Sequence, residues 1–300
     1  MKIAGFTIIR NAILNDYPIV EAIRSILPTV DEMIVSVGKS EDKTLELIQS
    51  IADPKIRIVE SEWDMSLRKG GQVLAVETNK AMAHISPDAD WAFYIQGDEA
   101  LHEKYIPKVQ ESCQKYLDDV SVEGLLFDYL HFYGTYDYVG DSRKWYRREI
   151  RIIRHKAQPK NEPITAFRDA QGFRKEGKKL LVKHSGAAIY HYGWVKSPEQ
   201  MKAKMKNVAR FWKEEDDWQS FLKSEDFFDY SEFDSLAKFK ESHPAVLEER
   251  IAKQDWHIEL DLSKKKFKLK DRLLYWFEKR TGHRLFEFRN YRLKEDRHNV

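Results

Sequence analysis

The sequence predicts an α/β fold in which a mostly parallel sheet is flanked by helices and followed by a helical C-terminal extension. Short apolar, β-branched segments alternate with segments of helical periodicity over the first hundred residues, and this alternation is typical of βαβ units. The expected strands are apolar almost throughout, as strands covered on both faces are. A composition of 42% hydrophobic and 33% charged residues suits a globular chain.

The first half of the chain alternates strands with helices. Strands are expected at 3–9, 33–37, 56–59 and 91–95. Apolar residues at helical spacing predict one helix that ends at Pro28, a second after Asp42 and a third over 71–84. Ligands of parallel sheets bind beyond the carboxyl ends of the strands. The segments of interest are therefore those that follow the strands: Arg10-Asn11, Ser36 to Ser40, Glu60 to Trp63 and Gln96 to Glu99.

The second half is less regular. Strands are expected at 124–132, 149–154 and 187–192, and the Gly- and charge-rich segment 162–179 is expected to be a loop. After Pro198 the chain is expected to be helical to about residue 255. The predicted organisation is one α/β domain over 1–200 and a helical extension over 201–300.

Charge is balanced over the whole chain but not along it. The net charge of +2 comes from 51 basic and 49 acidic residues, and it gives no general support to nucleic-acid binding. Residues 264–300 carry 13 Lys/Arg and five Asp/Glu, with aromatic residues between them. Such a segment is typical of a peripheral membrane contact or of a docked helix with a solvated basic face. Nucleic-acid binding by this tail is the weaker alternative.

Cysteine content and hydropathy limit the class of protein further. Cys113 is the sole cysteine, so the chain can form no intramolecular disulfide and no thiolate metal cluster. No apolar run approaches the roughly 18 residues of a membrane span. Arg10 and Asn11 interrupt the first apolar stretch, which is therefore unlike a secretory signal. The expected location is the cytoplasm, with the inner face of the membrane as an alternative.

Two adjacent carboxylates follow the fourth expected strand. Asp98 and Glu99 come directly after Gln96-Gly97, and the glycine permits close backbone approach. Mg²⁺ and Mn²⁺ take one or two protein carboxylates and complete their coordination with water and phosphate oxygens. The segment therefore indicates a divalent cation that binds a phosphate; a solvated acidic turn is the alternative.

In their order along the chain, several motifs resemble family 2 glycosyltransferases of the bacterial type. They are Phe6-Thr7-Ile8-Ile9-Arg10-Asn11, Ser40-Glu41-Asp42-Lys43-Thr44, Thr78-Asn79-Lys80-Ala81, Gln96-Gly97-Asp98-Glu99 and Ile189-Tyr190-His191-Tyr192-Gly193-Trp194. The resemblance covers roughly residues 1–200 and implies a GT-A fold whose catalytic domain binds a nucleotide-sugar and, usually, a divalent metal. Val37-Gly38 stands where Asp-Asp is common in the family, and Gln96 replaces the first Asp of its Asp-x-Asp motif. The resemblance therefore implies no particular nucleotide base.

Roles follow from strand position and from the resemblance. The expected metal ligands are Asp98 and His191, and the expected donor-binding residues are Arg10, Asn11, Lys69, Asn79 and Asp98. Asp169 is the first choice for the catalytic base, with Asp128 and Glu162 as rivals, and Glu99 is expected either to support the site from behind Asp98 or to face the acceptor. Each has a structural alternative: a salt bridge or cap for Arg10 and Asn11, a packed strand residue for His191, and a surface charge for Asp169.

The predicted function is a metal-dependent glycosyltransferase, using Mn²⁺ or Mg²⁺, that moves a sugar from a nucleotide-sugar donor to a saccharide or lipid-linked acceptor. Inversion at the anomeric carbon is implied by the resemblance alone. A sugar-phosphate nucleotidyltransferase and a non-catalytic nucleotide-sugar-binding module are the alternatives. No nucleic-acid partner is expected.

Overall fold

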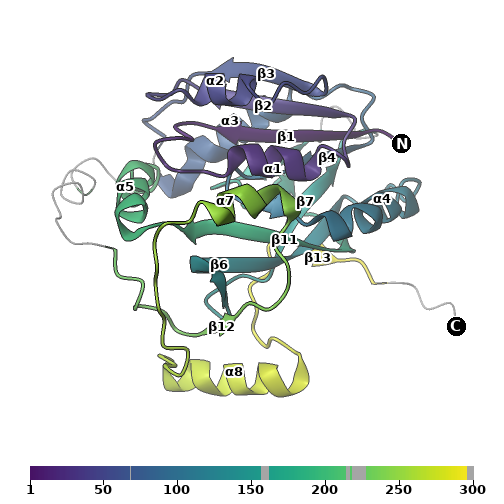
Figure 1. Cartoon of the computed structure of the whole chain (residues 1–300). Helices are drawn as coiled ribbons and strands as arrows, with labels where there is room; N and C mark the ends of the chain where they lie inside the picture. Colours follow the sequence, from purple (N-terminus) through teal and green to yellow (C-terminus); the bar gives the residue numbers. More distant parts are fainter. Residues whose placement is uncertain (68, 157–161, 214–216, 218–227, 296–300) are drawn as a thin grey trace, which may run out of the picture.

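The computed structural model describes residues 1–67, 69–156, 162–213, 217 and 228–295. Ten strands form its main sheet: β1 (Ile3–Ile9), β2 (Glu32–Gly38), β3 (Ile56–Ser61), β4 (Trp91–Tyr94), β5 (Glu99–Leu101), β6 (Gly124–Gly140), β7 (Arg148–Arg154), β11 (Leu181–Val195), β12 (Leu236–Lys238) and β13 (Arg292–Leu293). Their order is β13-β11-β6-β7-β4-β1-β2-β3, with β5 paired to β11 and β12 to β6 (Figure 1). Pairing is parallel from β4 through β1 and β2 to β3. The predicted mostly parallel α/β class is confirmed.

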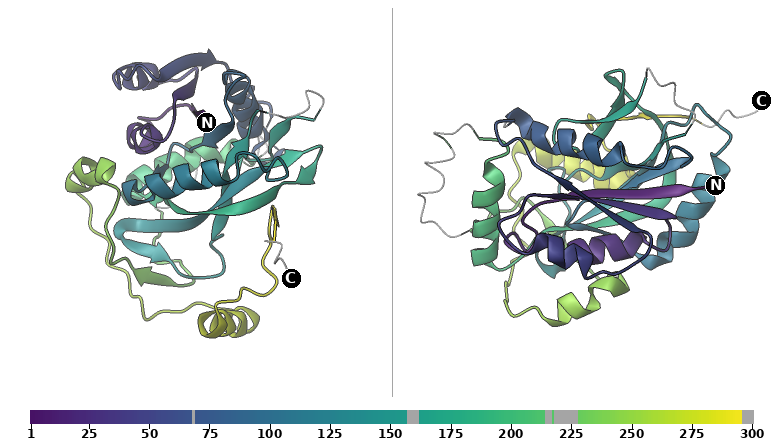
Figure 2. Two further views of the ribbon diagram at one scale, coloured as in Figure 1. Left: turned by 90° about the vertical axis from the view of Figure 1, so that its right-hand side faces the viewer. Right: turned by 90° about the horizontal axis from the view of Figure 1, so that it is seen from above.

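Helices cover both faces of this sheet (Figure 2). Side chains of α1 (Ile19–Ile26), α2 (Thr44–Gln49) and α4 (Ile106–Lys115) share one core cluster, and those of α3 (Gln72–Met82) share another. Along β1, Ile3 and Ile9 enter the first cluster, whereas Phe6 and Ile8 enter the second. All seven β1 residues are buried, which explains why this strand reads as an unbroken apolar run. Within the described part of the chain, no helix has both the length and the apolar character needed to cross a membrane.

The prediction of a loop over 162–179 is wrong. This segment folds into a three-stranded antiparallel sheet of β8 (Ile164–Phe167), β9 (Gly172–Lys175) and β10 (Lys178–Lys179). Ile164 and Phe173 are buried in the same core cluster as α3. Strands of two to four residues contain too few positions for an alternation of period two to be recognised.

The chain after residue 200 is less helical than predicted. Among the residues that the structure describes there, the α-helices are the end of α5 (Pro198–Ala209), α7 (Glu248–Ala252) and α8 (Leu269–Thr281). The strands β12 and β13 join the main sheet, and Tyr230 and Phe233 pack with Tyr133 of β6 in an aromatic cluster. Aromatic burial against β6 thus replaces the expected helix over the described residues 228–244. Residues 214–216 and 218–227, also expected to be helical, lie outside the described part.

Candidate functional site

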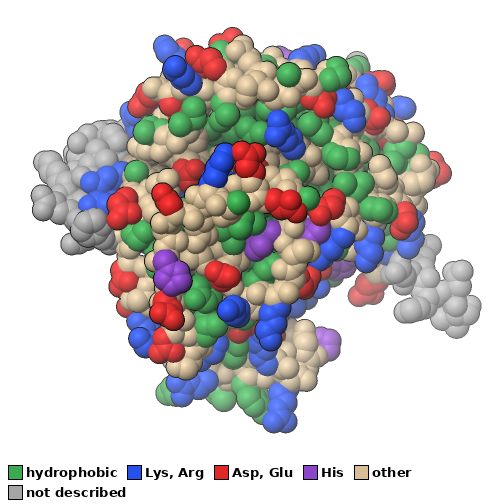
Figure 3. Space-filling model, viewed as in Figure 1, with side chains coloured by type: hydrophobic (Ala, Val, Ile, Leu, Met, Phe, Trp, Pro, Cys, Tyr) green, Lys and Arg blue, Asp and Glu red, His purple; other side chains and the backbone are tan. Residues whose placement is uncertain are grey.

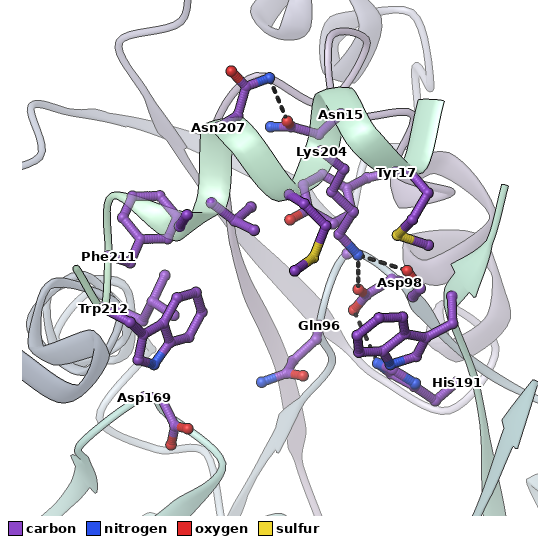
Figure 4. Close-up of a pocket in the computed structure, with 18 of the residues that line it drawn as sticks. Asn15, Tyr17, Gln96, Asp98, Asp169, His191, Lys204, Asn207, Phe211 and Trp212 are labelled. Atoms are coloured by element: carbon purple, nitrogen blue, oxygen red, sulfur yellow. Dashed lines mark hydrogen bonds and ion pairs between the residues drawn. The ribbon is translucent and has the colours of Figure 1, made fainter. Parts of the chain in front are cut away.

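A cavity of about 1050 Å³ lies at the carboxyl ends of β1 and β4 (Figure 4). Its walls include residues that follow β1, residues 96–98 after β4, the end of β11 and one side of α5. Of the residues predicted from sequence, it brings together Arg10, Asn11, Asp98, Asp169 and His191. The cavity therefore lies where the ligands of a parallel sheet are expected to bind.

Pairing of β5 with β11 brings Asp98 next to His191. In this antiparallel pair Glu99 lies opposite His191, and the Tyr192 amide donates a 2.7 Å hydrogen bond to the Asp98 carbonyl. Asp98 Oδ1 lies 3.8 Å from His191 Nε2. At Gly193 a Cβ would lie 2.7 Å from both Asp98 Oδ2 and His191 Cε1, so only glycine permits this approach.

Lys204 holds the other oxygen of the Asp98 carboxylate. Its Nζ lies 3.1 Å from Asp98 Oδ2 and donates a 2.8 Å hydrogen bond to the Gly193 carbonyl. Ser197 and Gln200 cap the N-terminus of α5 reciprocally, which fixes the start of the helix that carries this lysine. Burial alone would raise the pKa of Asp98, but the positive charge and the hydrogen bond of Lys204 hold it below its ordinary value. Asp98 is therefore a carboxylate at neutral pH.

A chain of hydrogen bonds sets the orientation of the His191 ring. His131 Nε2 lies 2.8 Å from the Tyr146 carbonyl, and His131 Nδ1 lies 3.3 Å from His191 Nδ1. Burial lowers the pKa of His131 well below its ordinary value, so this ring is neutral. Since a carbonyl only accepts, His131 Nε2 is protonated and its Nδ1 accepts from His191 Nδ1. Burial lowers the pKa of His191 as well, so this ring is also neutral and the lone pair of its Nε2 faces Asp98.

The donor set of Asp98 and His191 fits a divalent cation. Two atoms with lone pairs, His191 Nε2 and Asp98 Oδ1, face each other across 3.8 Å. Two ligand atoms that each lie about 2.1 Å from one ion, on its opposite sides, are roughly 4 Å apart. A separation of 3.8 Å is therefore short enough for both atoms to bind the same ion. Among the described residues no third carboxylate, imidazole or thiolate joins the pair. The remaining coordination positions would belong to phosphate and water, as is usual for Mg²⁺.

Glu99 points into the core rather than into the cavity. Its carboxylate accepts two hydrogen bonds from Arg151, of 2.7 and 2.9 Å, and further bonds from Tyr129 Oη and the Gln96 amide. Glu99 and Arg151 are both fully buried, and neither lines the cavity. Of the two roles expected for Glu99, its contacts fit the supporting one, because its carboxylate holds residues 96–98 from within the core and does not face the cavity.

The Glu99–Arg151 pair extends to the cavity floor through Gln171. Arg151 Nη2 lies 3.5 Å from Gln171 Oε1, and Gln171 Nε2 donates a 3.3 Å hydrogen bond to Gln96 Oε1. Gln96 and Gln171 both line the cavity. Gln96 is therefore fixed by neutral hydrogen bonds.

Asp169 lies on the cavity wall apart from Asp98, beside Trp212 (Figure 4). Its neighbours Arg168 and Ala170 both have left-handed backbones, with φ of 56° and 59°, which is costly for residues with a Cβ. This strained turn holds Asp169 at the cavity. The rival carboxylates lie elsewhere: Asp128 pairs with Arg148 at 2.8 Å, Glu162 pairs with Lys175 at 3.4 Å, and neither lines the cavity.

Two predicted donor-binding residues are engaged within the protein itself. The Arg10 guanidinium binds the Lys39 carbonyl at 2.9 Å and Glu41 at 2.8 Å, and Asn11 Oδ1 accepts from the Glu41 amide. Both still line the cavity, so they hold residues 39–41 while facing it.

Among the described side chains, that of Asn79, another predicted donor-binding residue, does not line the cavity. Asn79 Oδ1 accepts a 2.7 Å hydrogen bond from the Ala166 amide and so joins α3 to β8. The Lys69 backbone forms a short turn before α3, and the side chain of Lys69 lies outside the described part.

Aromatic side chains form much of the cavity wall. They include Trp63, Tyr94, Tyr133, Trp145, Tyr146, Trp194, Phe211, Trp212, Phe228 and Phe233. Flat aromatic faces of this kind can stack on a base or pack against a sugar ring. Trp63 packs on Gly38, where a Cβ would lie 2.4 Å from the indole nitrogen. That nitrogen is buried against Gly38 and has no hydrogen-bond partner within the described structure.

Sequence reasoning missed Lys204, His131 and Arg151. Lys204 lies on the same side of α5 as Met201, Met205 and Val208, all of which line the cavity. A lysine within an apolar helical face is a usable signal, because buried lysines are almost always paired. Arg151 stands between Ile150 and Ile152 in a buried strand, which likewise requires an acidic partner. We find no comparable signal for His131.

No protein-family profile and no curated protein matches the chain. Among solved structures, the chain is similar to S. aureus TarS 1–349 in complex with UDP, with 17% identity over 74% of this chain and 70% of that chain and a TM-score of 0.41. A longer TarS structure is 15% identical over 74% of this chain and 42% of that chain, with a TM-score of 0.40. The structure of glucosyl-3-phosphoglycerate synthase from Mycobacterium tuberculosis in complex with Mn²⁺, UDP and phosphoglyceric acid is 21% identical over 43% of each chain, with a TM-score of 0.30.

The chain thus spans less than half the length of the longer TarS structure and of the synthase. These similarities are weak, and the assignment of the cavity rests on its own residues.

Proposed function

We propose that this protein is a glycosyltransferase that binds a nucleotide-sugar in the cavity and transfers its sugar to an acceptor hydroxyl. The observation that carries the proposal is the facing pair of Asp98 Oδ1 and His191 Nε2 at the carboxyl edge of the sheet. A divalent cation, Mn²⁺ or Mg²⁺, held by this pair would neutralise charge on the departing diphosphate.

The chain's own residues supply the remaining steps. Lys204 keeps Asp98 ionised and adds a positive charge beside the diphosphate position. The wall formed by Trp63, Arg10 and Asn11 accepts the nucleoside. Asp169, held by its strained turn, accepts the proton of the attacking hydroxyl.

Calorimetry with a panel of UDP-, GDP-, ADP-, dTDP- and CMP-sugars in the presence of Mn²⁺ tests this proposal. We expect one nucleotide class to bind and EDTA to weaken its binding. Failure of the folded protein to bind any member of the panel would refute the proposal. Cation-enhanced binding with neither hydrolysis nor transfer would favour a binding module.

A further inference from the structure

One side of α8 carries exposed apolar side chains. Leu269, Leu273 and Trp276 are 80%, 69% and 56% exposed. Spacings of four and three residues place them in one stripe along the helix. Single exposed apolar residues are common, but a contiguous stripe marks an interaction surface.

The opposite side of α8 is fixed to the body of the protein. Tyr275 Oη donates a 2.6 Å hydrogen bond to Asp141, Lys279 pairs with the same carboxylate, and Arg143 Nη1 lies 2.8 Å from Glu278 Oε2. Since these residues occupy the other side of the helix, the docking contacts hold the apolar stripe outward. The docked helix considered from the sequence is thus present, and its outer side is apolar as well as basic.

Basic residues surround the stripe. Residues 264–280 hold eight Lys/Arg and two Asp/Glu. Lys268, Lys270 and Arg272 are exposed and form no ion pair within the described part of the chain, and Arg280 lies over the Trp276 ring. Figure 3 shows blue and green side chains together at the lower edge of the molecule, where α8 lies in Figure 1. Apolar and positive surface therefore coincide.

We propose that the α8 surface, defined as Leu269, Leu273, Trp276, Lys268, Lys270 and Arg272, binds an anionic lipid bilayer. The apolar stripe would enter the boundary between headgroups and acyl chains, while the basic residues pair with lipid phosphates. Trp276 lies in the stripe, and tryptophan prefers this interfacial depth. A nucleic acid would satisfy the positive charges but would leave the apolar side chains in water.

The segment that docks α8 is also part of the cavity wall. Asp141 and Arg143 hold the helix, whereas Lys144, Trp145 and Tyr146 line the cavity. A bilayer bound at the α8 surface would therefore lie close to this wall. If the proposed function holds, the acceptor is then a saccharide anchored to a lipid rather than a free saccharide.

Vesicle sedimentation in about 0.1 M salt tests the proposal. The probes are phosphatidylcholine vesicles with and without about 30% phosphatidylglycerol. We expect the full chain to bind only the anionic vesicles. The double variant Leu273→Ser/Trp276→Ser should bind anionic vesicles at least about tenfold more weakly. The triple variant Lys268→Gln/Lys270→Gln/Arg272→Gln should bind them about a hundredfold more weakly. The matched control is Ile13→Ser with Val120→Ser, at side chains that are 51% and 66% exposed elsewhere.

Four outcomes would overturn the proposal. The first three are no binding of the full chain to anionic vesicles, equal binding by the Leu273/Trp276 variant and its control, and loss of a dimer in that variant, which would assign the stripe to a second copy. Stronger binding to a DNA duplex, sensitive to the lysines alone, would equally exclude a bilayer as the partner. Vesicle binding needs no nucleotide-sugar, so its failure is distinct from failure of the proposed enzymatic function.

Discussion

The Arg151 guanidinium binds the Glu99 carboxylate at two points, 2.7 and 2.9 Å, and both side chains are completely buried. The next residue back along the chain, Asp98, lines the cavity. Neighbouring residues at a strand end point in opposite directions, so two adjacent carboxylates have separate tasks. Glu99 anchors the strand end from within the core, and Asp98 faces the cavity.

The Glu99–Arg151 pair should therefore act on stability. Glu99→Ala should lower the free energy of unfolding by about 3–5 kcal/mol, because it leaves Arg151 buried without its partner. Glu99→Leu combined with Arg151→Met should cost at least about 1.5 kcal/mol less than the sum of the two single changes. Urea unfolding measures both values. The same cycle on the more exposed Asp128–Arg148 pair should give a coupling below about 1 kcal/mol. An unchanged stability with abolished turnover in Glu99→Gln would instead make Glu99 catalytic.

Asp169 should affect transfer and not donor binding. Asp169→Asn removes the proton acceptor while keeping the shape of the side chain, so turnover with acceptor should fall at least about 100-fold. Donor affinity in calorimetry should stay within about threefold, as expected for a loss confined to the transition state. The controls Asp128→Asn and Glu162→Gln, at carboxylates outside the cavity lining, should leave turnover unchanged. A larger loss in either control would move the base to that residue.

His131 should govern cation affinity without contacting the cation. His131→Phe keeps a ring in the aromatic cluster but removes the acceptor for His191 Nδ1. Loss of such an orienting hydrogen bond typically weakens metal binding by about 10–100-fold. Titration of Mn²⁺, followed by electron paramagnetic resonance, measures this. His184→Phe, at an exposed position on β11, is the control. Equal Mn²⁺ affinity in both variants would show that His191 needs no such support.

Glu149 should make stability fall as pH rises. Burial raises the pKa of Glu149 from its ordinary 4.5 to about 8, against the opposing effects of Arg151 and Asn290. The folded state therefore binds this proton more tightly than the unfolded chain does. The stability that this bound proton contributes is complete below pH 4.5 and is lost as pH rises through 8, a change of about 5 kcal/mol. Urea unfolding from pH 5 to 9 should show this decline, and Glu149→Gln should flatten it. An identical slope in the variant would contradict this role.

The N-terminal half was predictable from sequence because its strands and helices have clear periods. Buried β1, β2 and β4 are short apolar runs, and α1 repeats its apolar residues at helical spacing. The small sheet at 164–179 was not, because each of its strands has two to four residues and shows too little alternation to be recognised.

The candidate site was only partly predictable. Asp98 and His191 are 93 positions apart in the sequence, and only the long-range pairing of β5 with β11 brings them together. Spacing alone could not predict that contact, whereas the family resemblance suggested it. The opposite directions of Asp98 and Glu99 depend on a three-residue strand that follows a Gly-Asp turn and has no sequence signature of its own. Lys204 enters from a helix that follows the predicted domain, so no motif includes it.

The most direct test of the account measures nucleoside diphosphate released from the donor by the wild-type protein and by Asp98→Ala. Asp98 supplies one of the two facing ligand atoms and binds Lys204, so its loss removes the cation site while the Glu99–Arg151 anchor remains. We predict Mn²⁺-stimulated release by the wild type and at least about 100-fold slower release by the variant, with an unchanged far-ultraviolet circular dichroism spectrum. Equal rates for the two folded proteins would contradict the central claim.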